Sequence, residues 1–105
     1  MDELEALFLA NGVDLHFSGH QHSYTRTCPV ARYACTPGAP VYVCNGAAGA
    51  LFTVGGIVPA YANLTLAFSD DQWGVSYFEA NGTHLHGQWV LNADGSVADD
   101  FWLVK

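Results

Sequence analysis

The stretch VDLHFSGHQHSYTRTCPV, residues 13–30, begins as a strand and then turns through a glycine into two histidines. Apolar and polar residues alternate across residues 13–18, which is the pattern of a half-buried strand. Gly19 follows, and then His20 and His22 flank one glutamine. Ligands of α/β sheets bind beyond the carboxyl ends of strands. The stretch therefore predicts a strand that leads directly into a candidate metal loop.

The residues on either side of this strand predict an α/β opening. DELEALFLA, residues 2–10, carries apolar residues at helical spacing and acids in its first turn, where the helix dipole favours them. Asn11 and Gly12 are typical of a helix end. VYVCN, residues 41–45, predicts a second, buried strand, whereas the proline-containing segment from the histidines to Pro40 predicts irregular structure.

The last third of the chain predicts an antiparallel β meander. Asn-Gly and Asp-Gly pairs are strong hairpin signals, because these residues accept positive φ. Such pairs, together with one Asp-Asp pair, separate four strand-like pieces, which are residues 61–69, 73–80, 83–91 and 96–104. The predicted fold class is α+β, with a helix and a strand followed by the meander.

Composition and charge exclude several classes of protein. The chain has 105 residues and is 50% hydrophobic, enough for the core of one small domain or part of a larger one. Ten acidic residues against three basic ones give a net charge of −7, so nucleic-acid and anionic-membrane partners are not expected. No apolar run approaches the roughly 18 residues of a membrane span, and MDELEALF lacks the features of a signal peptide.

The spacing of His20 and His22 suits a pair of metal ions. Residues i and i+2 of an extended chain point the same way with Cα atoms about 6–7 Å apart. Two-metal sites hold their ions about 3.5–4 Å apart, so each ion can take one of the two imidazoles. The alternative is a solvated loop with two incidental histidines, and the chain does not supply nearby the carboxylates that such a site also needs.

Three blocks of the sequence, in order, resemble the purple acid phosphatases, a family of metallophosphoesterases. VDLHFSGHQHSYTRTCPV resembles the GHxH block, and PVYVCNGAAG resembles the strand and loop that follow it. NGTHLHGQWVLNADGSVADDFWLVK resembles the C-terminal block, so the likeness runs from about residue 3 to 105. It implies that residues 1–35 are the end of the metallophosphoesterase domain and residues 36–105 a C-terminal β region, and that the chain is a fragment of a larger fold.

The resemblance implies hydrolysis of phosphate monoesters at a binuclear centre of Fe(III) with Zn, Mn or Fe(II). His20 would bind the divalent ion and His22 the ferric ion. The family's other ligand segments lie upstream of the GHxH block and have no counterpart in this chain, so we expect little or no activity from these residues alone. The alternative function is a non-catalytic β-rich binding or structural module with a vestigial GHxH motif.

Two residues after the histidines are candidates for substrate contact or for support of the site. Tyr24 would form a wall of the site. Arg26 would order the loop or meet substrate phosphate, or else form an ion pair with Asp14 or another acid. The family usually has Glu where this chain has Thr25, which removes a carboxylate that could orient the loop.

The remaining histidines and the tryptophans are interpreted as structural. His16 would pack in the core or an interface, and His84 and His86 would lie on a hairpin surface. Tryptophans are more often packing residues than sugar platforms, and we apply this interpretation to Trp73, Trp89 and Trp102.

Cysteines and glycosylation sequons favour a secreted, extracellular or vacuolar protein. In an oxidising compartment Cys28 and Cys35 are the plausible pair and Cys44 a buried thiol, whereas in the cytosol all three stay reduced. Similar members of the family carry cysteines at the first two places. Asn63 and Asn81 each begin an N-glycosylation sequon.

Overall fold

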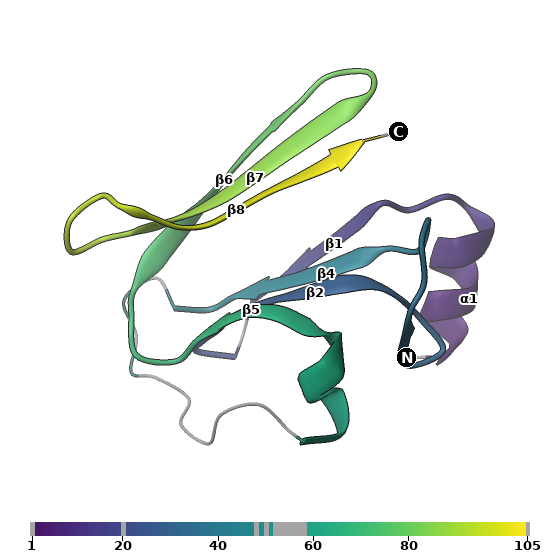
Figure 1. The fold of residues 1–105 in the computed structure, drawn as a ribbon, viewed down its shortest axis with the longest axis horizontal. Coiled ribbons are helices and arrows are strands. Elements are labelled where there is room, and N and C mark those ends of the chain that lie inside the picture. The colour runs from purple at the N-terminus through teal and green to yellow at the C-terminus, as the bar shows by residue number, and fades with distance from the viewer. Residues whose placement is uncertain (1, 20, 48, 50, 52–58, 105) are drawn as a thin grey trace.

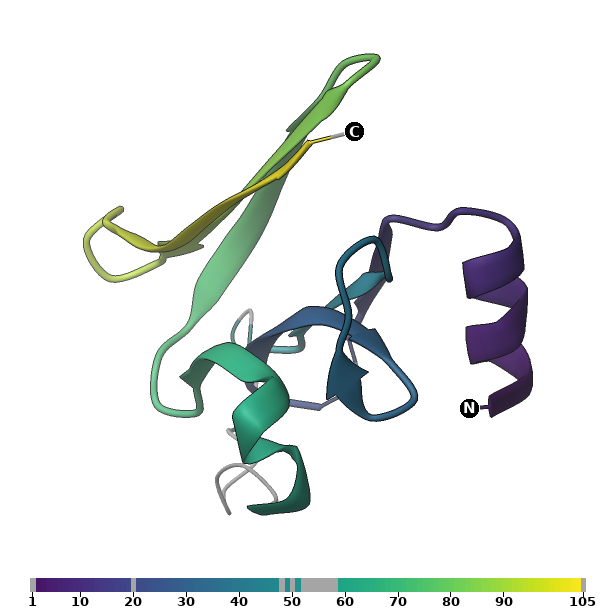
Figure 2. The same ribbon diagram turned by 45° about the vertical axis from the view of Figure 1, so that its right-hand side comes forward.

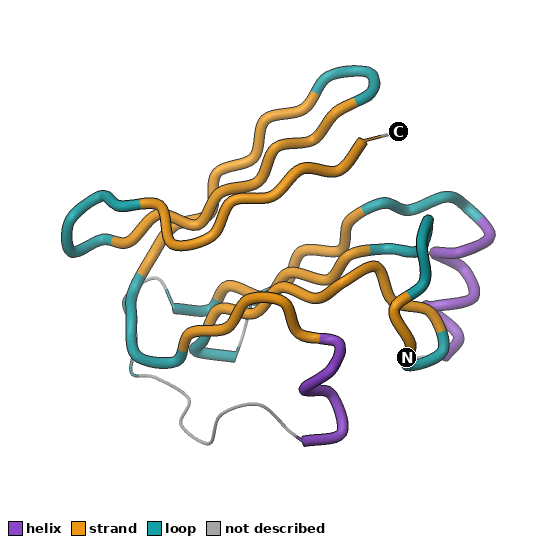
Figure 3. Tube along the Cα trace, in the orientation of Figure 1, coloured by secondary structure: helices purple, strands orange, loops and turns teal. Residues whose placement is uncertain are grey.

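The chain forms two β-sheets and one α-helix in the part that the structure describes (Figures 1 and 3). This structure is a computed structural model, and it describes residues 2–19, 21–47, 49, 51 and 59–104. The elements in chain order are α1 (Asp2–Ala10), β1 (Leu15–Ser18), β2 (Tyr24–Ala31), β3 (Ala34–Cys35), β4 (Val41–Asn45), η1 (Pro59–Leu64), β5 (Thr65–Ser69), β6 (Gly74–Ala80), β7 (His84–Leu91) and β8 (Val97–Val104).

The first sheet has the order β1-β4-β2-β3, and β5 pairs with β2. β1 runs parallel to β4, so the carboxyl ends of these two strands meet at one edge of the sheet. α1 precedes β1 and ends at Ala10, and the φ of 65° at Gly12 then lets the Val13 N–H reach back to the Phe8 carbonyl at 3.0 Å. The predicted helix, first strand and buried second strand are confirmed.

The second sheet is the meander β6-β7-β8, antiparallel throughout. In the β6–β7 turn, the Asn81 side-chain oxygen accepts the Thr83 and His84 N–H groups, both at 2.9 Å. In the β7–β8 turn, Gly95 takes a φ of 73° that few other residues adopt. These two turns are the ones that the Asn-Gly and Asp-Gly pairs predict.

Two predictions about secondary structure are wrong. The predicted strand at 61–69 is a 3₁₀ turn followed by β5, and β5 pairs with β2 in the first sheet instead of joining the meander. The segment up to Pro40 contains β2 and β3, so it is not irregular. β2 continues through Pro29 because its register shifts there, and the Tyr42 N–H bonds to the Thr27 hydroxyl at 3.0 Å.

The core lies between the two sheets. In the turned view of Figure 2 the three-stranded sheet lies above the larger sheet, with its strands at an angle to it. Large buried side chains come from both layers, Tyr24, Val41 and Val43 from the first sheet and Trp89 and Phe101 from the second.

α1 packs on the opposite face of the first sheet, where Phe8 contacts the ring of His16 at 5.4 Å. His16 also contacts Tyr42, at 5.6 Å between ring centroids. Much apolar surface stays exposed nearby, including about half of Leu4 and of Leu7 on α1. This face of the fold is therefore only partly covered in the 105-residue chain.

Candidate metal loop

The candidate metal loop, residues 19–23, begins directly after β1 and leads into β2. His20 lies outside the described residues. His22 is half-buried, and its Nδ1 lies 2.5 Å from the carbonyl oxygen of Leu51. A carbonyl oxygen only accepts hydrogen bonds, so Nδ1 carries the proton, and the lone pair of the neutral ring is on Nε2. Metal-binding histidines commonly have this arrangement, with the other ring nitrogen donating to a carbonyl or carboxylate, and imidazole suits iron and zinc.

Gly46, just beyond β4, holds the loop by close backbone contact. Its N–H donates to the Ser23 carbonyl at 3.1 Å, and the Ser23 N–H donates to the Gln21 carbonyl at 2.8 Å. A Cβ atom on Gly46 would lie 2.0 Å from the Gln21 carbonyl oxygen. Only glycine therefore allows the segment after β4 to lie this close to the loop.

Tyr24, the first residue of β2, is buried between the sheets. Only 1% of the residue is exposed, and its ring stacks on Trp89 with centroids 4.4 Å apart and an interplanar angle of 7°. Its hydroxyl donates to Asp99 Oδ2 at 2.6 Å. The expected wall of an open site is thus a core residue that links β2 to β7 and β8.

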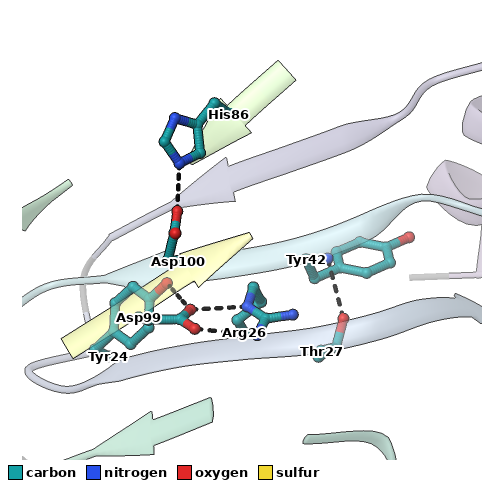
Figure 4. Close-up of polar contacts among 7 residues, drawn as sticks. All are labelled: Tyr24, Arg26, Thr27, Tyr42, His86, Asp99 and Asp100. Atoms are coloured by element: carbon teal, nitrogen blue, oxygen red, sulfur yellow. Dashed lines mark hydrogen bonds and ion pairs between the residues drawn. The ribbon is translucent and has the colours of Figure 1, made fainter. Parts of the chain in front are cut away.

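Arg26 binds the same carboxylate (Figure 4). Its Nε donates to Asp99 Oδ2 at 2.7 Å and its Nη2 to Asp99 Oδ1 at 3.0 Å. The guanidinium also lies over the ring of Phe101, 4.9 Å from the centroid. Among the alternatives for Arg26, the structure contains an ion pair, and the acid is Asp99 instead of Asp14.

The protonation states of these three groups follow from their contacts. Burial raises the pKa of Asp99, but hydrogen bonds from Arg26 and Tyr24 and the Arg26 charge outweigh it and lower the pKa below its ordinary value. The hydrogen bond with Asp99 raises the pKa of Arg26. Burial, followed by the hydrogen bond with Asp99 and its charge, raises the pKa of Tyr24. At neutral pH a carboxylate therefore accepts bonds from a guanidinium and a neutral phenol.

Sequence reasoning did not single out Asp99, Gly46 or Leu51. A signal for Asp99 exists, because it alternates with Phe101 and Leu103 and so shares their inward face of β8. An acid on an apolar face needs a buried cation or donors. Leu51 contributes through its backbone, which no sequence signal reveals.

The second His-x-His pair lies on the outer face of the meander. His86 stacks on Trp102 with centroids 4.1 Å apart and forms an ion pair with Asp100 (Figure 4). His84 Nδ1 bonds to the Thr83 hydroxyl at 2.6 Å. Within the described residues, no group of three or more histidine, cysteine or acidic side chains could hold a metal. This pair thus has structural contacts of its own, as interpreted from the sequence.

The cysteines lie on strands of the first sheet, and the sequon asparagines lie at exposed positions. Cys28 and Cys35 form a disulfide that joins β2 to β3. Cys44 is a half-buried thiol. Asn63 and Asn81 are both exposed, the first in η1 and the second in the β6–β7 turn.

Comparison with known proteins places the chain in a family. A family model described as iron/zinc purple acid phosphatase-like protein C matches residues 39–100. The chain belongs to this purple acid phosphatase family. The match covers β4 through the first half of β8 and includes both Gly46 and Asp99.

Proteins similar to this purple acid phosphatase chain are about four times its length. Mouse acid phosphatase type 7 is 32% identical over 113 residues, covering 97% of this chain and 26% of the relative. Purple acid phosphatase 1 of Ipomoea batatas is 35% identical over 119 residues, covering 96% of this chain and 24% of the relative. The chain spans about a quarter of the relatives it matches.

A solved structure shares the fold of this purple acid phosphatase chain. Purple acid phosphatase PPD1 from yellow lupin (Lupinus luteus) seeds superposes with a TM-score of 0.83 at 25% identity, covering 96% of this chain and 19% of that one.

In the part of the chain that the structure describes, no helix is long and apolar enough to cross a membrane.

Proposed function

We propose that this chain contributes two histidine ligands, His20 and His22, to the binuclear metal centre of an acid phosphatase that hydrolyses phosphate monoesters. The observation that carries the proposal is the bond between His22 Nδ1 and the Leu51 carbonyl, which places the lone pair of the neutral ring on Nε2. The loop also follows the carboxyl end of β1, beside the parallel strand β4, where α/β sheets bind ligands.

The proposed centre holds Fe(III), bound by His22, and Zn, Mn or Fe(II), bound by His20. When bound, such ions supply positive charge that stabilises the phosphoryl transition state and activate the attacking water. The two histidines hold and orient the ions and move no proton. Because two imidazoles fill only part of two coordination shells, the proposal needs further ligands from beyond the described residues.

The same proposal covers location and modification. The Cys28–Cys35 disulfide supports an oxidising compartment, which for this family would be extracellular or vacuolar. Asn63 and Asn81 are the proposed glycosylation sites, and both are exposed. The partner is a phosphate monoester, and the net charge of −7 argues against nucleic-acid or anionic-membrane partners.

A zinc titration of the chain tests the ligand assignment, because the chain carries two His-x-His pairs. Zinc binding is followed through the imidazole ¹⁵N resonances of the wild type, of a His20→Ala/His22→Ala variant and of a matched His84→Ala/His86→Ala variant. We expect zinc to shift the resonances of the loop histidines, and only the first variant to abolish this binding. Binding that survives in the first variant and disappears in the second would overturn the proposal.

Hydrolysis of p-nitrophenyl phosphate tests the need for further ligands. We expect the isolated chain to act no faster than the His20→Ala/His22→Ala variant, with Fe(III) and Zn(II) supplied. A metal-dependent difference would show that these residues hold more of the catalytic machinery than the proposal assigns. If the loop bound no metal at all, the alternative of a non-catalytic β-rich module would be favoured.

A further inference from the structure

We propose that Asp99 of β8 is a positioning residue for the candidate metal loop, acting through Tyr24 and Arg26. The assignment of a metal to this loop rests on the proposed function, but the positioning itself can be measured without metal. Tyr24 and Arg26 are the first and third residues of β2, the strand that begins where the loop ends.

Tyr24 is held on two sides. Its ring stacks on Trp89, and its hydroxyl donates to Asp99 at 2.6 Å. Tyr24 follows His22 by two residues, so their Cα atoms can be at most about 7 Å apart. Because only one residue separates them, a displacement of Tyr24 should also displace the His22 backbone.

The carboxylate of Asp99 has a fixed orientation. Arg26 binds both of its oxygens, at 2.7 and 3.0 Å, and Oδ2 also receives the Tyr24 hydroxyl. Side-chain exposure is 16% for Arg26 and 8% for Asp99, so water competes weakly for these bonds. The two β2 side chains thus share one acceptor that cannot rotate without breaking three hydrogen bonds.

The candidate metal loop has separate supports on its other side. Gly46 bonds to Ser23, and the Leu51 carbonyl bonds to His22. Removing the Asp99 support should therefore shift the loop without unfolding it. Asp99 belongs to the second sheet, whereas Gly46 directly follows β4 of the first sheet. A change in how the two sheets pack should therefore change the position of His22.

The chain supplies a matched control for Asp99. Asp100 is its neighbour on β8 and points to the opposite face, toward His86 (Figure 4). Asp100→Asn and Asp99→Asn change the same residue type, strand and net charge. Leu103→Ala is the second control, since the apolar side chain of Leu103 packs against the core and forms no hydrogen bond, so that its loss lowers stability through packing alone.

The experiment compares Tyr24→Phe and Asp99→Asn with these two controls in the full 105-residue chain. Tyr24→Phe keeps the ring stack and the ion pair and removes only one hydroxyl, so it stays folded even if Asp99→Asn does not. One measurement is the His22 ring ¹⁵N shifts and the backbone shifts of the candidate metal loop without metal. The other is zinc affinity under conditions where every variant is fully folded.

We expect both test variants to move the His22 and loop resonances and to weaken zinc binding about 10-fold, the lower end of the effect of removing an outer-shell partner. Both controls should leave the loop resonances unchanged. Their zinc affinity should stay within about 2-fold of wild type, a smaller change than the 10-fold loss expected of the test variants. Wild-type loop resonances in Tyr24→Phe would overturn the positioning role. A wild-type chain that binds no zinc would overturn the proposed function, while the metal-free resonances would still decide the positioning role.

Discussion

Gly46→Ala should displace the candidate metal loop. The added Cβ would lie 2.0 Å from the Gln21 carbonyl oxygen and 2.7 Å from its carbon, whereas real Cβ contacts stay above 3.0 Å. The loop backbone must then retreat by about 1 Å, which matches the shortfall between these distances. Overpacking of this kind costs about 1–3 kcal/mol. Loss of the Gly46–Ser23 hydrogen bond adds about 1 kcal/mol, so we expect a total of about 2–4 kcal/mol.

Gly82→Ala is the matched control, because a Cβ there meets nothing within 4 Å and the residue has no positive φ. Urea unfolding followed by tryptophan fluorescence gives the free energy of unfolding of both variants. We expect the control to stay within about 0.5 kcal/mol of wild type. The ring ¹⁵N shifts of His22 should change in Gly46→Ala alone. Equal free energies of unfolding for the two variants, together with unchanged His22 shifts in Gly46→Ala, would refute the idea that backbone contact at Gly46 fixes the position of the loop.

Three further predictions concern the sheets. Asp99→Asn should cost about 2–4 kcal/mol at pH 7, because it leaves a mostly buried guanidinium unpaired, whereas exposed Asp100→Asn should cost under about 1 kcal/mol. The pKa of Asp99 is lowered in the folded state, so the ionised carboxylate stabilises the fold fully above its ordinary pKa of about 3.9. This stabilisation is lost as the pH falls through the folded-state pKa, and urea unfolding curves of wild type and Asp99→Asn should therefore converge in acid. Gly87→Ala places a Cβ 2.3 Å from the Phe101 ring and should lower the thermal midpoint by about 4–8 °C per kcal/mol lost; an unchanged midpoint would contradict that packing. Amides of β1, which lies beside a partly uncovered helix, should exchange with solvent faster than those of β6, and slower exchange in β1 would contradict this order.

The sequence predicted those elements whose signals are local. The helix end before Gly12 and the turns at Asn81 and Gly95 depend on residues adjacent in the chain, and the structure has all three. β5 was misplaced because sequence adjacency favours joining the next hairpin. Its pairing with β2 depends on contacts between segments about 40 residues apart, such as Arg26 with Ala67, and periodicity contains no information about such partners.

The same distinction applies to the candidate site. The positions of His22 and Tyr24 at a strand exit followed from the pattern of residues 13–30 and from the family resemblance. Asp99 could be recognised only as an acid on an apolar face, because its partners lie 73 and 75 residues away. The Leu51 carbonyl is a backbone atom, and any residue type could supply it.

The distance along the chain between Tyr24 and Asp99 has a consequence for biosynthesis. A ribosome adds about 5–20 residues per second, so the 75 residues that separate the two take about 4–15 s to make. During that interval the histidine loop has emerged, or is emerging, without the carboxylate that fixes the start of β2. A nascent chain therefore presents its histidines before they have their final geometry. If the loop binds metal as proposed, stable capture of an ion would then wait until β8 has been released and has docked.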